Sequence, residues 1–397
     1  MTPAARYSAA IEVLDGFLAG NPTEKLLSNW ARRNRYAGSK DRAAVRDIVF
    51  DCLRNLRSYQ QVAGFTGGRA LALGHCLAHA LQPQEVFSGQ GYAPTPLDTD
   101  ELAAYESDHS LASEGEDCDV QDWLIDPLKE SLGDGFSETC QIMRNRAPVD
   151  LRVNLRKSDR AATQAALALE EILTEPVDFV DTALRVLENP RRVAGSKPYL
   201  DGRVELQDAA SQAVVAMLPL ENSPRVLDYC AGGGGKTLAI AALAPSARIT
   251  AYDQSTARLM PLRERAKRAG VPVRLLKQHP QEKDGLYDLV LIDVPCSGSG
   301  SWRRNPEAKW RLTPETLAGL NETQSGILNT AKNLVAPGGT LAFVTCSVLR
   351  AENEQQVAQF SKENADWRAT LEHRFNLQDG GDGFFLALLT RGQTTIG

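Results

Sequence analysis

The sequence lacks the features that would place the protein in a membrane or build a disulfide framework. No stretch of about 18 consecutive apolar residues occurs, so no membrane span is expected. Residues 1–20 show no charged-then-apolar signal pattern. The seven cysteines are odd in number and include no CxxC pair, and the five histidines do not cluster with them. We therefore expect no metal site, reduced thiols and a cytoplasmic protein.

The chain also lacks an excess of positive charge, since its formal net charge is -6. This acidity is local, however, because residues 98–122 contain ten acidic residues and no lysine or arginine. The rest of the chain carries a net positive charge. A nucleic-acid partner is therefore not excluded.

A length of 397 residues predicts two or three domains, at about 150 residues per domain. Apolar residues three and four apart predict a helical domain over residues 1–85, with one helix starting near Ser39. The Gly-, Pro- and acid-rich residues 86–122 indicate a linker or long surface loop. We expect a small α+β subdomain at 123–215 and a larger α/β domain at 216–397, with a monomeric chain overall.

Residues 144–160 form the densest basic stretch of the N-terminal half. Alternating apolar residues from Val149 to Leu155 predict a strand whose other face carries Arg152. Such a face is either a solvated strand edge or a surface that contacts RNA phosphates. Arg152 is therefore a candidate RNA-binding residue.

From residue 216 onward, short apolar runs alternate with helical segments. The runs are RVLDY, RITAYD, VRLL, YDLVLID, GTLAFVT and FFLALLT. This alternation is typical of βαβ units around a buried, mainly parallel sheet.

The first strand-to-helix turn contains four consecutive glycines, Gly232 to Gly235, followed by Lys236. A phosphate-binding P-loop is excluded, because its first glycine position is Cys230. The dinucleotide motif GxGxxG fails as well, because its third glycine position holds Thr237 or Leu238, depending on the starting glycine. A methyltransferase loop fits, with an acid near the end of the next strand.

That acid is Asp253, whose carboxylate suits the two hydroxyls of a ribose. The alternative is that Asp253 is the N-cap of the following helix.

Two later strands end in reactive side chains. YDLVLID delivers Asp293 and Cys296, and GTLAFVT delivers Cys346. Ligands of open α/β sheets bind beyond the carboxyl ends of the strands, so these three side chains should converge. A single cysteine after a strand is more often a buried thiol, but two at one edge indicate chemistry.

Such a pair suits methylation of a pyrimidine at carbon 5, which is a weak nucleophile. A thiolate that adds to carbon 6 makes an enamine, and the enamine carbon 5 can attack a sulfonium methyl group. An acid must then balance charge near ring nitrogen 3, and a second group must help to remove the proton on carbon 5.

These motifs resemble the Sun-like RNA cytosine-C5 methyltransferases, and within them the B type that acts on small-subunit ribosomal RNA. The matching stretches are LDYCAGGGGKT, AYDQSTARLMPL, DVPCSGSGSWRRNPEAKW, LVAPGGTLAFVTCSVLRAENEQQV and DGFFLALLTR. Upstream, LRVN and YLDGRVELQDAASQ are similar to the preceding subdomain of the family. GSKDRAAVRDIVFDCLR is similar to its all-α, NusB-like domain.

The resemblance implies a class I, Rossmann-like methyltransferase core with a mixed, mainly parallel sheet, and S-adenosylmethionine as methyl donor. It implies that Cys346 is the nucleophile, that Cys296 aids product release, and that Asp293 contacts cofactor and cytosine. The implied cofactor-binding residues are Asp228, Cys230, Ala231, Gly232, Gly233, Gly234, Gly235, Lys236, Asp253, Arg258 and Asp293.

The chain departs from the family pattern at two places. Gly232-Gly233 stands where the family has Ala-Pro, which should loosen the loop. The stretch LKQHPQEKDG lacks the family's adenine-binding Asp, so His279 or a backbone carbonyl is expected to replace it.

Residues 301–312, SWRRNPEAKWRL, interleave aromatic and basic side chains directly after Cys296. They suit stacking on bases and phosphate contact, although a packed tryptophan pair is the alternative. The candidate RNA-binding residues here are Trp302, Arg303, Arg304, Lys309 and Trp310. The target cytosine must be flipped or single-stranded.

The expected function is therefore cytosine-C5 methylation of RNA, with ribosomal RNA as the expected target. Methylation of another RNA such as tRNA, or a weakly active RNA-binding ribosome-assembly factor, are the alternatives.

Overall fold

The computed structural model describes residues 1–107, 113–222 and 224–392. The chain forms two compact units. Unit 1 contains Met1–Arg146 and Trp302–Arg311, and unit 2 contains Ala147–Ser301 and Leu312–Gly397. The expected subdomain boundary at residue 122 stays a prediction. Among the described residues, no helix has the length and apolar character needed to cross a bilayer.

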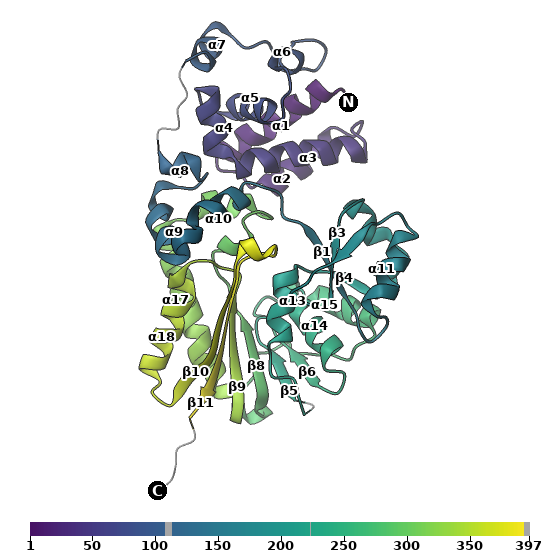
Figure 1. The fold of residues 1–397 in the computed structure, drawn as a ribbon, viewed down its shortest axis with the longest axis vertical. Helices are drawn as coiled ribbons and strands as arrows, with labels where there is room; N and C mark the ends of the chain where they lie inside the picture. The colour runs from purple at the N-terminus through teal and green to yellow at the C-terminus, as the bar shows by residue number, and fades with distance from the viewer. Residues whose placement is uncertain (108–112, 223, 393–397) are drawn as a thin grey trace. The chain divides into compact units, whose positions relative to one another are not determined.

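Unit 1 is helical, as the apolar spacing of residues 1–85 predicts (Figure 1). Its larger helices are α1 (Pro3–Leu18), α2 (Thr23–Arg33), α3 (Ser39–Arg54), α4 (Leu56–Ala63), α5 (Gly68–Ala78), α9 (Ile125–Leu132) and α10 (Phe136–Met143). Helix α3 begins at the expected Ser39. A ten-residue segment that follows the first reactive strand, YDLVLID, also belongs to this unit and includes α16 (Pro306–Arg311).

The acidic stretch expected as a linker or loop contains short helices, α6 (Pro83–Val86), α7 (Thr99–Tyr105) and α8 (Glu114–Asp117). Helix α7 begins with a capping box in which Asp98 and Glu101 cap each other's backbone. Ser113 and Glu116 form the same arrangement at α8. Part of the acidity therefore serves to cap helices. Residues 108–112 lie outside the described residues.

Unit 2 begins with a small antiparallel sheet of order β2-β3-β1-β4. Its strands are β1 (Val149–Val153), β2 (Thr174–Pro176), β3 (Ala183–Val186) and β4 (Val204–Leu206), with α11 (Arg160–Ala168) and α12 (Lys197–Leu200) beside them. The expected strand over Val149–Leu155 is confirmed, as β1.

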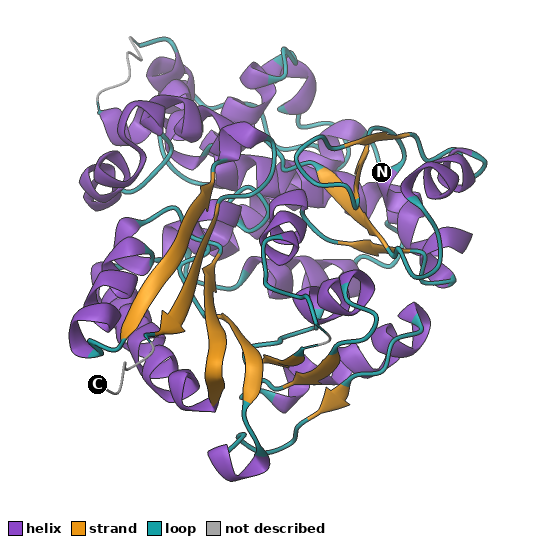
Figure 2. Ribbon diagram, turned by 60° about the horizontal axis from the view of Figure 1, so that its bottom comes forward, coloured by secondary structure: helices purple, strands orange, loops and turns teal. Residues whose placement is uncertain are grey.

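The second sheet of unit 2 has the order β10-β11-β9-β8-β5-β6-β7. The parallel strands are β5 (Arg225–Asp228), β6 (Arg248–Ala251), β7 (Arg274–Leu275), β8 (Tyr287–Asp293) and β9 (Val335–Thr345). Strands β10 (Trp367–Phe375) and β11 (Phe384–Arg391) are antiparallel. The sheet twists so that its strands fan out (Figure 2). The expected mixed, mainly parallel sheet is confirmed.

Helices cover both faces of this sheet (Figure 1). One face packs with α13 (Ala209–Ala216), α14 (Gly235–Leu243) and α15 (Thr256–Ala269). The other packs with α17 (Pro314–Ala331) and α18 (Glu354–Glu363). Neighbouring residues of one strand alternate between the two cores, as Val226 and Leu227 do. This double cover explains why the strands are continuous apolar runs in the sequence.

The register brings the carboxyl ends of the central strands to one edge. Asp228 of β5 pairs with Leu291 of β8, and Asp293 at the end of β8 pairs with Val344 of β9. Cys346 follows Val344 by two residues. The loops after β5, β8 and β9 therefore leave the sheet side by side.

Candidate active site

The glycine loop between β5 and α14 adopts a backbone that needs glycine at two positions. Gly232 has φ +51° and Gly234 has φ +81°, both in the left-handed region. A Cβ on Gly234 would lie 2.2 Å from a methyl carbon of Leu262, a core residue of α15. A proline at position 233 would disfavour a helical or left-handed conformation at residue 232. With glycine at positions 232 and 233, the loop therefore adopts a backbone conformation that Ala-Pro at these positions would disfavour.

Asp253, two residues after β6, closes the loop from the other side. Its carboxylate accepts hydrogen bonds from the backbone N–H of Gly232 and of Ser255, both at 2.8 Å. Ser255 is the N-cap of α15, so the alternative that Asp253 caps that helix is wrong. The guanidinium of Arg258 lies 3.9 Å from the Asp253 carboxylate. A buried carboxylate with remaining lone pairs thus faces the glycine loop.

Asp228 at the end of β5 is buried and only partly satisfied. Its Oδ2 accepts a hydrogen bond of 2.6 Å from the hydroxyl of Thr237, whereas its Oδ1 has no partner. Burial raises the pKa of Asp228 to about 7, although the Thr237 hydrogen bond opposes this rise. An orphaned acceptor beside a glycine loop is suited to a cationic ligand group such as an ammonium.

Arg152 lies beneath this loop and not on a basic surface. Its side chain is 3% exposed, and its Nη1 donates to Gln207 and, at 2.7 Å, to the carbonyl of Gly235. Burial lowers the pKa of Arg152 to about 10. The prediction that Arg152 faces RNA is contradicted, because its guanidinium is used to hold the first residue of α14.

The two cysteines converge, as the strand ends predict. The Sγ atoms of Cys296 and Cys346 are 3.4 Å apart, although the residues are 50 positions apart in the chain. The hydrogen bond from Cys296 is the largest effect that lowers the pKa of Cys346, and the same contact raises the pKa of Cys296. Cys346 is therefore the thiol that ionises more readily, and Cys296 keeps its proton.

Lys236 and Asp293 form an ion pair beside the thiols, with Nζ and Oδ2 2.7 Å apart. Burial lowers the pKa of Lys236, but attraction and hydrogen bonding to Asp293 outweigh it, so the net shift is upward. The ammonium group therefore stays charged, and it lowers the pKa of Cys346 in turn. The structure thus brings together Cys296, Cys346, Asp293 and Lys236.

Two further residues of the glycine loop, Cys230 and Ala231, have defined surroundings. Burial raises the pKa of Cys230 strongly, so this thiol is inert. The N–H of Ala231 donates to the carbonyl of Tyr252 at 2.9 Å, which ties the loop to the end of β6.

An aromatic cluster borders the same edge near the expected adenine site. The hydroxyl of Tyr229 and Nε2 of His279 are 2.6 Å apart, and the His279 ring lies 5.6 Å from the Tyr252 ring. Because Tyr252 directly precedes Asp253, the exposed His279 lies close to the ribose-binding candidate.

The segment predicted to stack on RNA is instead packed into unit 1. Trp302 and Lys309 are each 1% exposed and Arg303 is 5% exposed. Lys309 donates to the carbonyl of Arg54 at 3.0 Å, and burial lowers its pKa to about 8. The prediction of an RNA-facing surface is contradicted for these three residues by their burial.

Two candidate RNA-binding residues in this segment are less buried. Trp310 is half-buried, and its Nε1 donates to the carbonyl of Leu53 at 2.6 Å. Arg304 is exposed.

Two residues that matter to the site were missed in the sequence. Thr237 binds Asp228, and the fully buried Glu352 binds the loops of both cysteines. Neither carries a local signal, because an isolated threonine after a glycine loop or a glutamate in an acidic stretch is commonplace.

One group of potential metal ligands lies in unit 1. Ligand atoms of Asp51, His75 and His79 fall within 4.8 Å of one another. The two imidazole rings are stacked, with centroids 4.1 Å apart and planes 15° apart. Because a ring nitrogen binds a metal in the plane of its ring, near-parallel rings do not direct both lone pairs at one ion. We assign no metal to this group.

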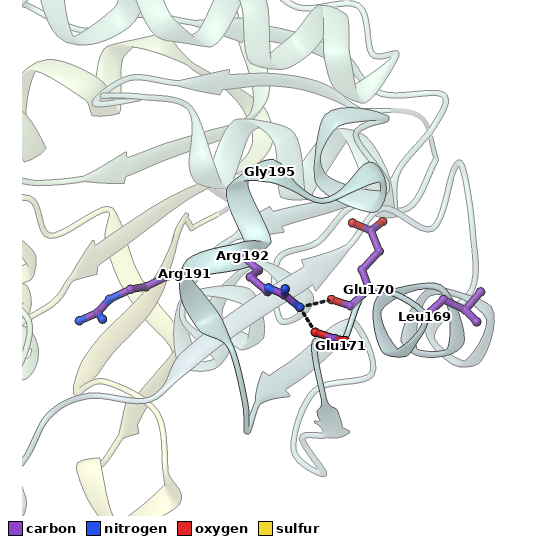
Figure 3. A pocket seen from close by; sticks show the side chains of 6 residues that line it. All are labelled: Leu169, Glu170, Glu171, Arg191, Arg192 and Gly195. Carbon is purple, nitrogen blue, oxygen red and sulfur yellow. Dashed lines mark hydrogen bonds and ion pairs between the residues drawn. The ribbon is translucent and has the colours of Figure 1, made fainter. Parts of the chain in front are cut away.

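A pocket of about 510 Å³ lies beside the small sheet. It is lined by Leu169, Glu170, Glu171, Arg191, Arg192 and Gly195. Figure 3 shows Arg192 directed at Glu171 and at the carbonyl of Glu170, which accept its hydrogen bonds. Arg192 and Glu171 thus form an ion pair in this pocket, which contains none of the expected site residues.

Comparison with known proteins agrees with this geometry. Residues 215–390 match the family model described as 16S rRNA methyltransferase RsmB/F, and residues 121–194 match the ferredoxin-like domain of RsmF/B-like methyltransferases. The ribosomal RNA small subunit methyltransferase B of Klebsiella pneumoniae subsp. pneumoniae is 36% identical over 68% of this chain and 65% of that protein. The protein of the same name from Vibrio cholerae is 32% identical over 68% of this chain and 64% of that protein. The chain thus spans slightly under two thirds of the length of these relatives.

Solved structures share the fold at low sequence identity. A crystal structure of the protein PH0851 is 22% identical, with a TM-score of 0.77 over 98% of this chain and 99% of that one. NSun6 from Pyrococcus horikoshii, crystallised with SFG, is 17% identical, with a TM-score of 0.60 over 68% of this chain and 98% of that one. These likenesses support a methyltransferase fold.

Proposed function

Because this chain belongs to the RsmB/F family of 16S rRNA methyltransferases, we propose that it methylates carbon 5 of a cytosine in RNA, with S-adenosylmethionine as methyl donor. The observation that carries the proposal is the thiol pair, with Sγ atoms 3.4 Å apart beside the ion pair of Lys236 and Asp293. A half-buried thiol with a lowered pKa next to a second, protonated thiol does not serve packing. It suits an attack followed by a separate release step.

The residues around the glycine loop fit the cofactor. Orphaned Oδ1 of Asp228 suits the ammonium of the methionine end, and Gly232 and Gly234 keep the loop open to close approach. Asp253 suits the ribose hydroxyls, and His279 with Tyr229 suits the adenine edge in place of the family's Asp. When bound, the cofactor supplies an electrophilic methyl group on a sulfonium.

Cys346 begins the reaction as a thiolate. Its sulfur forms a bond to carbon 6 of cytosine, and the displaced electron pair is stabilised by protonation at nitrogen 3, for which the ammonium of Lys236, held by Asp293, is the available donor. Carbon 5 of the resulting enamine would be the nucleophile for the methyl group that a bound cofactor supplies. Once its sulfur is bonded to carbon 6, Cys346 no longer raises the pKa of Cys296, so Cys296 can lose its proton to solvent and act as a base. The Cys296 thiolate then takes the carbon 5 proton, nitrogen 3 returns its proton, the double bond between carbons 5 and 6 re-forms, and Cys346 leaves as a thiolate.

The test is methyl transfer to 16S rRNA, with tRNA as the competing substrate, measured with labelled cofactor and located by bisulfite sequencing. Cys346→Ala should abolish transfer while cofactor affinity, measured by calorimetry, changes less than about twofold, since the thiol forms bonds only to RNA. Cys52→Ala is the matched control, since Cys52 is a buried free thiol of unit 1 and belongs to none of the loops of the site. Full activity of Cys346→Ala would disprove the mechanism, and cofactor binding without any transfer would favour the RNA-binding assembly factor.

A further inference from the structure

Glu352 is a fully buried carboxylate that the proposed chemistry does not use. It ends a short 3-10 turn, Arg350–Glu352, six residues after Cys346, and its side chain is 0% exposed. A charged carboxylate is costly to bury unless its oxygens are hydrogen-bonded. The hydrogen bonds of Glu352 therefore have to account for its burial.

Four donors surround this carboxylate. Ser297 donates both its N–H, at 2.7 Å, and its hydroxyl, at 2.5 Å. The hydroxyl of Ser347 donates at 2.5 Å, and the amide of Gln324 donates at 3.1 Å. Ser297 directly follows Cys296 and Ser347 directly follows Cys346, so one carboxylate binds the residue after each reactive thiol.

Further hydrogen bonds make the junction of the two loops rigid. The hydroxyls of Ser299 and Ser347 are 2.9 Å apart, and the N–H of Gly300 donates to the carbonyl of Cys346 at 3.0 Å. The same amide of Gln324 also donates to the carbonyl of Pro295 at 3.1 Å. Glu352 accepts hydrogen bonds from four donors in this network and lies outside the tripeptides that contain the two cysteines.

We propose that Glu352 is a positioning residue that sets the spacing of Cys296 and Cys346 by holding their two loops on one carboxylate. The catalytic consequence of this inference rests on the proposed function. The distance between the two Sγ atoms, in contrast, is a property of the protein without RNA or cofactor. The contact between the thiols also supplies the largest lowering of the pKa of Cys346, so a wider gap would raise that pKa.

The decisive variant is Glu352→Gln, which keeps the shape of the side chain but replaces one acceptor with a donor that faces other donors. Glu363→Gln is the matched control, because Glu363 is exposed on α18 and touches neither loop. Both variants lose one negative charge in the same part of the chain. Unfolding curves identify the variants that are folded.

The first measurement needs no RNA. Diamide oxidises the two thiols to a Cys296–Cys346 disulfide and is itself reduced to the hydrazine, and mass spectrometry of the linked peptides gives the rate. Because the rate depends on how often the sulfurs meet, we expect Glu352→Gln to slow linking by about tenfold or more, with Glu363→Gln unchanged. An unchanged rate in a folded Glu352→Gln variant would overturn the proposal.

The second measurement is turnover. A misplacement of about 1 Å costs on the order of 100-fold, so kcat of Glu352→Gln should fall by about that factor while KM for RNA and cofactor stays within about threefold. The limb of the pH–rate profile that reports the Cys346 thiol should move to higher pH. A fall in kcat without slower linking would also overturn the proposal, because Glu352 would then act by other means.

A third variant covers the case in which Glu352→Gln does not fold. Ser347→Ala removes one donor and keeps the carboxylate, so slower linking in this variant supports the proposal and an unchanged rate refutes it. If the wild-type protein links its thiols rapidly, Glu352→Gln links them slowly, and no RNA is methylated, the spacing role stands and the proposed function fails.

Discussion

Among the four possible Gly→Ala substitutions in the glycine loop, Gly234→Ala should destabilise the loop most. A left-handed backbone costs a residue with a Cβ about 1–2 kcal/mol, and Gly234 has φ +81°. The new Cβ would lie 2.2 Å from Cδ1 of Leu262, which is 0% exposed and has no free space to occupy. Overpacking of this kind costs about 1–3 kcal/mol. The two costs together predict a loss of about 2–5 kcal/mol in the stability of this region.

Gly319→Ala on α17 is the opposite control. Gly319 is exposed, and a Cβ there meets nothing within 4 Å, so alanine should stabilise that helix by about 0.5–1 kcal/mol. Hydrogen exchange read on peptides from α14 and α17 measures both local effects in the same protein. Calorimetry should show weakened cofactor binding for Gly234→Ala only. If α14 exchanges as slowly in Gly234→Ala as in the wild-type protein, the loop reasoning is wrong.

Three further outcomes are expected. Burial raises the pKa of Asp228 to about 7 from an ordinary value of 3.8, so the folded state binds more protons between these values and its stability falls as pH rises through that window. Asp228→Asn should remove this fall, as shown by urea unfolding at pH 5 and pH 8, and an unchanged pH dependence would contradict the buried acid. Cys296→Ala should accumulate a covalent protein–RNA adduct that runs as a slow band in denaturing gels, and the absence of the band with a good substrate would remove the release role. Trp302→Ala should lower the stability of unit 1 by about 3–5 kcal/mol, because the side chain is 1% exposed, whereas an unchanged unfolding transition would show that the indole is not packed.

Local patterns in the sequence were enough to predict much of the fold and of the site. Apolar spacing of three and four marks the helices of unit 1, and continuous apolar runs mark the strands of the larger sheet. Because the reactive residues come directly after strands, their convergence followed from the general geometry of parallel sheets, and the contact of Cys296 with Cys346 agrees with it.

Contacts between distant segments could not be predicted in this way. Arg152 and Lys309 have the same local appearance as any exposed basic residue, and only packing shows that Arg152 binds Gly235 and Lys309 binds Arg54. Glu352 likewise gains two of its four hydrogen bonds from Ser297, which lies 55 residues earlier in the chain.

The sequence by itself determined which residues form the strands, which strands are followed by cysteines, and where a glycine-rich loop lies. Those properties depend on neighbours along the chain. The tertiary structure alone decided which charged groups are buried, which cysteine ionises, and which carboxylate holds the two loops. Burial and hydrogen-bond partners set these properties, and both come from residues far apart in sequence.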